Sequence, residues 1–464
     1  LALTGFRGFK QFGIIGLIGM VLCWFATFTV LPALLTFFER WKPLATSERI
    51  PKSYIAEILA NFVSRFPKAI SVATVVFTVA SGLFFLRYSP SIIETDLSKL
   101  RNRESMESGS GFYSQYVDEI FGRYLSPMVA LPRDYEDVPK LAAKYREKMA
   151  ADGENSLIKN VSVLNDFVPK DQPEKIRLLR EIARLLPPSI RSQLAPADRE
   201  RVEQFLRPEA FRPIRQQDLP TLVLNKFTEK DGSVGKLVLI EPPLKSVAND
   251  GDRLLAFIRD LRDIADSVRP GTPVAGSLPI SADMIQSINR DGPKATLFAF
   301  SAVVLLVIAL FRTPRAFLPV LLGLFLGVFW LGGLIMGFWI KINFLNFIAL
   351  PITFGIGVDY AVNVFNRYRE EGDESIIKVI RDTGGAVMLC SFTTAVGYGS
   401  LLIASNQAFV SFGILSVLGE VTCIIAAMFS MPALLLTFAK MKKGKNSQWQ
   451  PPLNESKRPP EHSL

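Results

Sequence analysis

Histidine and cysteine are scarce in this chain of 464 residues. The one histidine, His462, lies in a polar tail, and there are three cysteines. A single imidazole cannot build a Ser-His-Asp triad or a histidine metal cluster. Cys23, Cys390 and Cys423 all fall within long apolar runs, so neither a disulfide framework nor a zinc knuckle is expected. No serine, threonine or carboxylate is placed beside a base, and we therefore predict no enzyme activity, no cofactor and no metal site.

Charge is scarce in seven long stretches. Hydrophobic residues make up 49% of the chain, and a membrane-spanning helix needs about 20 predominantly apolar residues. The predicted fold class is a polytopic α-helical membrane protein with an α+β domain outside the membrane. The predicted spans are 11–38, 70–86, 296–311, 316–340, 344–365, 384–404 and 411–438.

Basic residues gather in loops that alternate along the chain. Lysine and arginine in short loops favour the cytoplasmic side of a membrane. Residues 39–69, the Arg312 and Arg315 loop, and the segments after the fifth and last spans are all basic, whereas Arg7 and Lys10 are a small violation. This pattern predicts that the large polar loop at 88–293 is translocated to the outer side of the membrane. The net charge of +10 is explained by the basic cytoplasmic loops and by their attraction to anionic lipid. We therefore expect no nucleic acid partner.

The polar loop at 88–293 alternates short apolar stretches with amphipathic helical stretches. Asp231-Gly232 marks a hairpin between its third and fourth strands. The order fits a ferredoxin-like core with a helical insertion. We predict strands at 128–131, 158–163, 221–227, 236–240 and 272–275, and helices at 138–149, 174–186, 198–205 and 252–268. The full division is a first membrane helix (1–38), a cytoplasmic linker (39–69), a second membrane helix (70–87), the outer domain (88–293), a five-helix membrane bundle (294–439) and a disordered basic cytoplasmic tail (440–464).

The first and last spans repeat each other. FGIIGLIGMVLCWFATFTVLPALLTFF aligns without a gap with FGILSVLGEVTCIIAAMFSMPALLLTF, and Gly19/Gly419 and Cys23/Cys423 are among the matched pairs. We interpret the first span as the last helix of a preceding repeat in a longer protein. The alternative is two similar helices within one intact protein.

Asp359 lies inside the fifth span, in ALPITFGIGVDYAVNVFNRYREEG. An ionised carboxylate at that depth is expensive and usually marks a proton or ion pathway. Tyr360 supplies a hydroxyl that could bond a facing carboxylate. Gly355 and Gly357 leave the backbone open to a close neighbour. The alternative is a carboxylate that bonds within the bundle or lies near the interface.

Small and hydroxyl residues follow one another in the sixth span. Ser391, Ala395 and Gly399 recur at a spacing of four, which predicts tight helix packing, and Thr393 and Thr394 add hydroxyls. Glu420 is a second acidic residue within a span, where the repeat has Met20. It either extends a proton path or bonds within the bundle, and the sequence leaves both open.

Four motifs together resemble the resistance-nodulation-division superfamily, and within it the MMPL branch of large bacterial lipid exporters. They are GIGVDYAVNVFNRYREE, SFTTAVGYGSLL, FGILSVLG followed by PALL, and IETDLSKLR at the start of the outer domain. The resemblance implies twelve spans and two periplasmic porter domains in the full protein, of which this chain holds the last helix of the first half and the complete second half. It also implies that Asp359 and Tyr360 form a proton-relay pair facing the other half's pair.

The resemblance therefore predicts export of lipid or another hydrophobic substrate, driven by the proton-motive force. The expected partners are protons, membrane lipid or hydrophobic cargo, the N-terminal half of the same protein, and a periplasmic carrier or further copies of the chain. The rival is a non-transporting lipid- or sterol-sensing scaffold of the same fold, which would tolerate a neutral residue at Asp359.

Overall fold

The chain divides into two compact units. The computed structural model describes residues 4–41, 53–87, 92–122, 124–207, 211–243, 250–371 and 376–438. A membrane unit comprises Leu1–Gly109 and Asp283–Leu464, and an outer unit comprises Ser110–Ala282. The predicted tail at 440–464 and residues 42–52 of the predicted linker lie outside the described residues.

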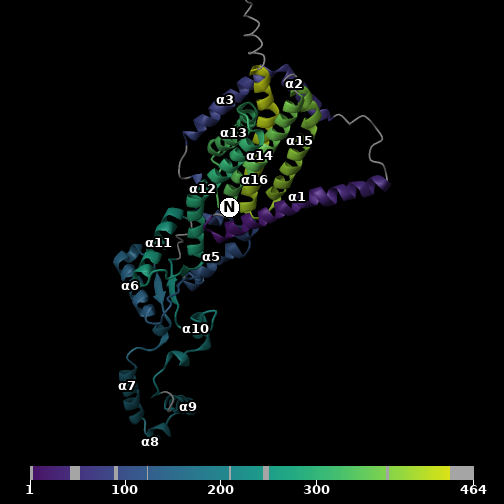
Figure 1. Ribbon diagram of the computed structural model, residues 1–464. Coiled ribbons are helices and arrows are strands. Elements are labelled where there is room, and N and C mark those ends of the chain that lie inside the picture. Colours follow the sequence, from purple (N-terminus) through teal and green to yellow (C-terminus); the bar gives the residue numbers. More distant parts are fainter. Residues whose placement is uncertain are drawn as a thin grey trace, which may run out of the picture. The chain divides into compact units, whose positions relative to one another are not determined.

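Long apolar helices make up the membrane unit (Figure 1). The α16 helix continues through a π-helical turn at Ala426–Ser430 and ends at Phe438. Among the described residues, seven helices are long and apolar enough to cross a membrane, which confirms the seven predicted spans and a multi-pass membrane protein. They are α1 (Arg7–Trp41), α3 (Pro67–Phe85), α12 (Ser277–Phe311), α13 (Pro314–Gly337), α14 (Ala349–Glu371), α15 (Ile376–Gly399) and α16 (Gln407–Ile425).

Small residues let the central helices α13, α14 and α16 pack closely. A Cβ atom added at Gly327 of α13 would lie 2.8 Å from the Cys423 backbone, and one added at Gly357 of α14 would lie 2.6 Å from the Cys423 sulfur. Leu324, Val364 and Met431 belong to the apolar core of the membrane unit. The short helix α2 (Tyr54–Arg65), capped by Ser53, packs along α15.

The first helix is different from its repeat copy. In the most apolar 18-residue stretch of α1, none of the residues is buried. In the corresponding stretch of α16, 56% of the residues are buried. Phe9 is the buried residue of α1, and its ring lies 4.9 Å from that of Phe347. The described residues therefore do not supply α1 with the neighbours that cover α16.

Residues 92–107, which we call the strap, lie along two loops of the membrane unit. The strap contains η2 (Leu97–Leu100) and α4 (Arg103–Glu107). The Glu94 amide donates to the Ile342 carbonyl at 2.8 Å, and the Arg103 amide donates to the Ser405 carbonyl at 2.9 Å. The strap is thus held by main-chain hydrogen bonds to the loops before α14 and α16.

The outer unit contains a small antiparallel sheet with strand order β2-β3-β1-β4. α6 follows β1, α11 follows β3, and the two helices pack together, with the Tyr145 hydroxyl donating to the Leu261 carbonyl at 2.9 Å. All of β3 is buried. The elements are β1 (Met128–Ala130), α6 (Asp137–Asp152), β2 (Asn160–Ser162), β3 (Val238–Glu241), α11 (Gly251–Val268) and β4 (Val274–Ala275), preceded by α5 (Ser110–Phe121).

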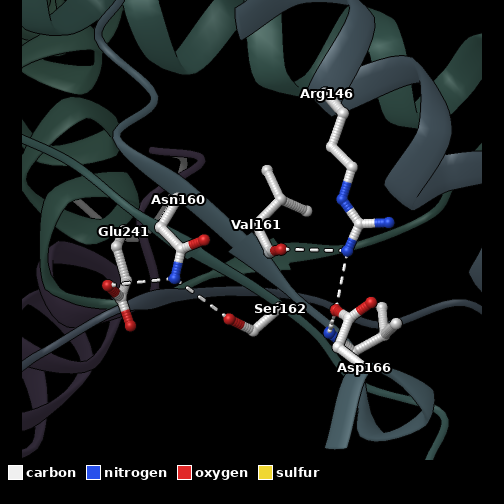
Figure 2. Close-up of polar contacts among 7 residues, drawn as sticks. Arg146, Asn160, Val161, Ser162, Asp166 and Glu241 are labelled. Atoms are coloured by element: carbon white, nitrogen blue, oxygen red, sulfur yellow. Dashed lines mark hydrogen bonds and ion pairs between the residues drawn. The ribbon is translucent and has the colours of Figure 1, made fainter. Parts of the chain in front are cut away.

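Polar contacts fix β2 and the turn that follows it (Figure 2). Arg146 of α6 donates to the Val161 carbonyl at 3.1 Å and to the Asp166 carboxylate at 2.6 Å. The Asn160 amide donates to the Ser162 hydroxyl at 3.2 Å. These bonds tie α6 to one edge of the sheet.

One predicted strand is wrong. Residues 221–227 form helix α10 (Thr221–Lys226) rather than a strand, and the Asp231-Gly232 turn closes only a single bridge between Thr228 and Val234. Pro220 immediately precedes α10, where proline favours a helix start over strand pairing. The other four strands and all four predicted helices are confirmed. Between β2 and β3 the chain forms α7 (Gln172–Arg184), α8 (Pro188–Arg191), α9 (Pro196–Phe205) and α10.

Candidate functional site

Asp359 lies in the interior of α14, on a face that none of the described residues covers. Its side chain is exposed. Gly355, one helical turn earlier, is also exposed, and a Cβ atom added there would meet no atom within 4 Å. We call this side of α14, marked by Gly355 and Asp359, the open face. A carboxylate on the apolar part of a membrane helix must find water, a partner or a proton there.

Tyr360 points the other way, into the bundle. Adjacent helical residues project about 100° apart, and Tyr360 is only 3% exposed. Its hydroxyl donates a hydrogen bond to Oε1 of Glu420 on α16. Ser391 of α15 is buried and interacts with both side chains. Three neighbouring helices thus meet at one buried polar cluster: Tyr360, Ser391 and Glu420.

Glu420 has no basic partner among the residues that the structure describes. It is 3% exposed, and the side chains that act on it are those of Tyr360 and Ser391. Sequence reasoning left its role open between a proton path and a bundle contact. The signal in the sequence was an acidic residue in an otherwise apolar span, at the position where the repeat has Met20. The structure adds its partner, because Tyr360 belongs to a different span.

The other predicted site residues take separate positions. Thr393 and Thr394 donate their hydroxyls back to the Cys390 carbonyl, at 2.8 and 2.9 Å. Ala395 is half-buried, and Gly399 is half-buried with open space where a Cβ atom would point. In this chain Gly357 is in close helix contact, whereas Gly355 and Gly399 are not. Among the residues the structure describes, no group of three or more metal-ligating side chains comes together.

An apolar cavity of about 570 Å³ lies in the membrane unit between α3, α12, α13 and α14. Sequence reasoning did not predict it, because its lining combines α3 and the strap with α12, α13 and α14, and no local pattern shows how these elements pack together. Aromatic side chains dominate the lining, among them Phe85, Phe300, Phe329, Phe347 and Phe354. Such a surface can bind an apolar chain or ring but offers little to a polar solute.

Known proteins identify the family. The model of the MMPL family matches residues 1–70 and 244–462, which is more than half of the chain. The chain belongs to the MMPL family. The resemblance to the MMPL branch of the resistance-nodulation-division superfamily, drawn from the Asp359 motif and its companions, is thereby confirmed.

Two curated MMPL relatives show the range of the similarity. The chain is 25% identical over 496 residues to the hopanoid transporter HpnN of Rhodopseudomonas palustris, covering 93% of this chain and 53% of that protein. It is 29% identical over 246 residues to the apo-petrobactin exporter of Bacillus anthracis, covering 48% and 33%. The chain thus spans about half the length of the hopanoid transporter and a third of the petrobactin exporter.

A more distant similarity is to a solved structure, the hedgehog release protein Disp of the water bear Hypsibius dujardini. The sequence identity is 14% and the TM-score is 0.44, with 86% of this chain and 49% of that one covered. A likeness at this level supports no conclusion about the MMPL chain described above.

Proposed function

We propose that this chain is part of a proton-driven exporter of lipid or other hydrophobic compounds in a bacterial inner membrane. The observation that carries the proposal is Asp359, a carboxylate on the open face of an apolar membrane helix. Its neighbour Tyr360 lies in a buried polar cluster. Two relatives are named as an exporter and as a hopanoid transporter, and these names also support a role in export.

Proton binding follows from the position of Asp359. The membrane disfavours the ionised form of a carboxyl group, so a shift in its surroundings changes whether it holds a proton. A membrane potential contributes about 2.3 kcal/mol per charge per 100 mV. A carboxyl group that loads on one side and unloads on the other can therefore draw on that energy.

The open face of α14 is the contact surface we propose for the other repeat. A longer transporter, with a length like that of the hopanoid relative, would bring an equivalent helix against Gly355 and Asp359. Gly355 supports this because it has room for a close helix. The N-terminal half of the same protein is thus the first expected partner of this chain.

The cargo we propose is hydrophobic. The aromatic cavity between α3, α12, α13 and α14 supports this, because few polar groups line it. We assign the outer unit to a ferredoxin-like porter domain in the periplasm. The supporting feature is its strand order, with one helix crossing after β1 and another after β3. A periplasmic carrier or further copies of the chain are the remaining partners.

The test is export by the full-length protein with Asp359→Asn, at matched membrane levels. Asparagine keeps the size of the side chain but cannot bind and release a proton. We expect export to fall at least about ten-fold, a modest effect for the loss of a proton-transfer group. The matched control is Thr394→Ala, because the Thr394 hydroxyl donates to the Cys390 carbonyl within its own helix.

Export by Asp359→Asn at the rate of the unmodified protein would reject the proton relay. The function would then move to the second candidate, a lipid- or sterol-sensing scaffold of the same fold that does not transport. The finding that favours this candidate over other classes is the apolar cavity, which a sensor would also need.

A further inference from the structure

The proton relay proposed above uses Asp359 and leaves a second acid unexplained. Glu420 is 3% exposed and lies within α16, on the side that faces α14. An ionised carboxylate in a low-dielectric interior without a basic partner is strongly disfavoured. In the described part of the chain, the side chains that act on Glu420 are those of Tyr360 and Ser391, and neither is basic. These surroundings favour the protonated form of Glu420 over the carboxylate.

The groups around Glu420 support this protonation state. Tyr360 faces it from α14, Tyr398 and Cys390 belong to the facing part of α15, and Cys423 lies one turn away on α16. None of these four side chains can carry a positive charge in any protonation state. The α13 helix, which also packs against α16, has no ionisable side chain beyond Arg315 at its start. On α14 the nearest basic residue, Arg367, lies about two turns beyond Tyr360, and on α15 the nearest, Arg381, lies almost three turns before Ser391.

A purely structural contact would not need an acid at this position. The Tyr360 hydroxyl donates to Glu420, so an amide carbonyl could accept the same bond. The equivalent position of the repeat is Met20, so the helix itself does not require a polar residue here. What an acid has and an amide lacks is a proton that it can release.

We propose that Glu420 is a second proton-binding carboxyl group of this transporter, and that Tyr360 and Ser391 hold it in position. The proposal rests on the proton-driven function inferred above. In the exchange, the carboxyl O–H bond breaks and the proton passes to water. The carboxylate that remains keeps the hydrogen bond donated by Tyr360. Uptake reverses these changes, and no other bond is altered.

The surroundings of Glu420 also indicate when this exchange takes place. The space beside it, lined by Thr353, Tyr398 and Ser416, is too narrow for a water molecule, and the Ser416 hydroxyl is buried there without a partner. Water can reach the carboxyl group only if the helices around it, α14, α15 and α16, move relative to one another. Proton exchange at Glu420 thus requires a rearrangement of the bundle that includes α14, the helix that carries Asp359, or its neighbours.

The experiment compares three variants of the full-length protein in an export assay, each at matched membrane level and thermal stability. Glu420→Gln keeps the acceptor for Tyr360 but cannot release a proton. Glu420→Asp keeps a titratable group. We expect at least about a ten-fold loss in Glu420→Gln, and partial export with a shifted pH profile in Glu420→Asp. Asp359→Asn is measured beside them.

The outcomes separate the two proposals. If Glu420→Gln retains at least half of the export while Asp359→Asn is inactive, the role of Glu420 is rejected and the Asp359 relay stands. An equal loss in Glu420→Gln and Glu420→Asp also rejects it, because the loss then follows geometry rather than the proton. Export by Asp359→Asn would reject the proposed function itself.

A spectroscopic measurement covers the case in which Glu420→Gln does not fold. Infrared spectra of Asp359→Asn, which retains Glu420, are recorded near neutral pH in H₂O and D₂O. A protonated carboxyl band that persists in this variant and exchanges slowly with D₂O supports a buried protonated Glu420. The absence of such a band overturns the proposal.

Discussion

Two glycines on α14 differ in what surrounds them. A Cβ atom at Gly357 would lie 2.6 Å from the Cys423 sulfur, whereas one at Gly355 would meet nothing within 4 Å. Replacing either glycine with alanine raises the helix propensity by about the same amount, roughly 1 kcal/mol. Any difference between the two variants in the free energy of unfolding therefore comes from packing.

We predict that Gly357→Ala destabilises this chain by about 1–3 kcal/mol relative to Gly355→Ala, the usual range for overpacking. Thermal unfolding of the purified chain in detergent measures the difference. Gly355→Ala is the matched control, since it lies on the same helix and has open space. Equal unfolding temperatures for the two variants would contradict the close contact between α14 and α16.

The sequence identifies Asp359 as exceptional but not the direction in which it points. A charged residue in an apolar span is visible in any sequence, and so is Tyr360 beside it. Which of the two faces the bundle depends on how α14 is rotated against α16, and that rotation is set by packing at Gly357 and Cys423. The bond between Tyr360 and Glu420 joins residues from different spans, and no local pattern predicts it.

The strap is held by main-chain hydrogen bonds as well as by the apolar packing of Ile92 and Ile93. The Arg103 amide donates to the Ser405 carbonyl at 2.9 Å, and the Gln407 amide donates to the Arg101 carbonyl at 3.2 Å. Arg103 is also the first residue of α4, and Asn102 before it has φ −63° and ψ 125°. Proline fits the first position of a helix and tolerates that conformation in the residue before it.

Arg103→Pro should therefore remove one strap hydrogen bond and leave α4 intact. We predict a loss of about 1 kcal/mol, the usual net value of such a bond, and faster amide hydrogen exchange at Gln407. Arg103→Ala is the control, because it keeps the amide and loses only an exposed 3.8 Å ion pair with Glu107. The same exchange rate in both variants would show that the strap is not held at this bond.

The sequence predicts helices and strands most accurately where the hydrophobic pattern extends over many residues. The seven spans run over many apolar residues, and α6 and α11 have several turns of helical periodicity. Residues 221–227 were mistaken for a strand because one apolar run of that length fits either structure. Pro220 and the 85% exposure of Leu222 agree with a helix that packs only on one side.

At the scale of the whole molecule, the two units do not divide where polarity changes. The outer unit begins at Ser110, after the strap, and α12 begins at Ser277, well before its apolar part. Charged residues such as Asp283 and Arg290 hide that helix start from a search for apolar runs. The strap, in turn, is polar and yet bonds to membrane-unit loops, which only the fold reveals.

The orientation of the molecule in the membrane can be tested with single cysteines. Basic loops favour the cytoplasm, so we predict that Arg315 lies inside while Lys230 and Ser405 lie outside. Cys23, Cys390 and Cys423 are first replaced by serine or alanine in the full-length protein. Single cysteines are then placed at the three test positions, each of which is exposed in the structure.

A membrane-impermeant maleimide added to spheroplasts should label cysteines at positions 230 and 405 and leave the one at 315 unlabelled until the membrane is permeabilised. Position 405 is the informative one, because it lies in a turn with no basic residue and is bonded to the strap through its carbonyl. If 230 and 405 are labelled from opposite sides, an odd number of spans separates them and the seven-span arrangement fails. If both are labelled only after permeabilisation, the arrangement holds but is inverted, and an outer unit in the cytoplasm could not receive cargo from the periplasmic side.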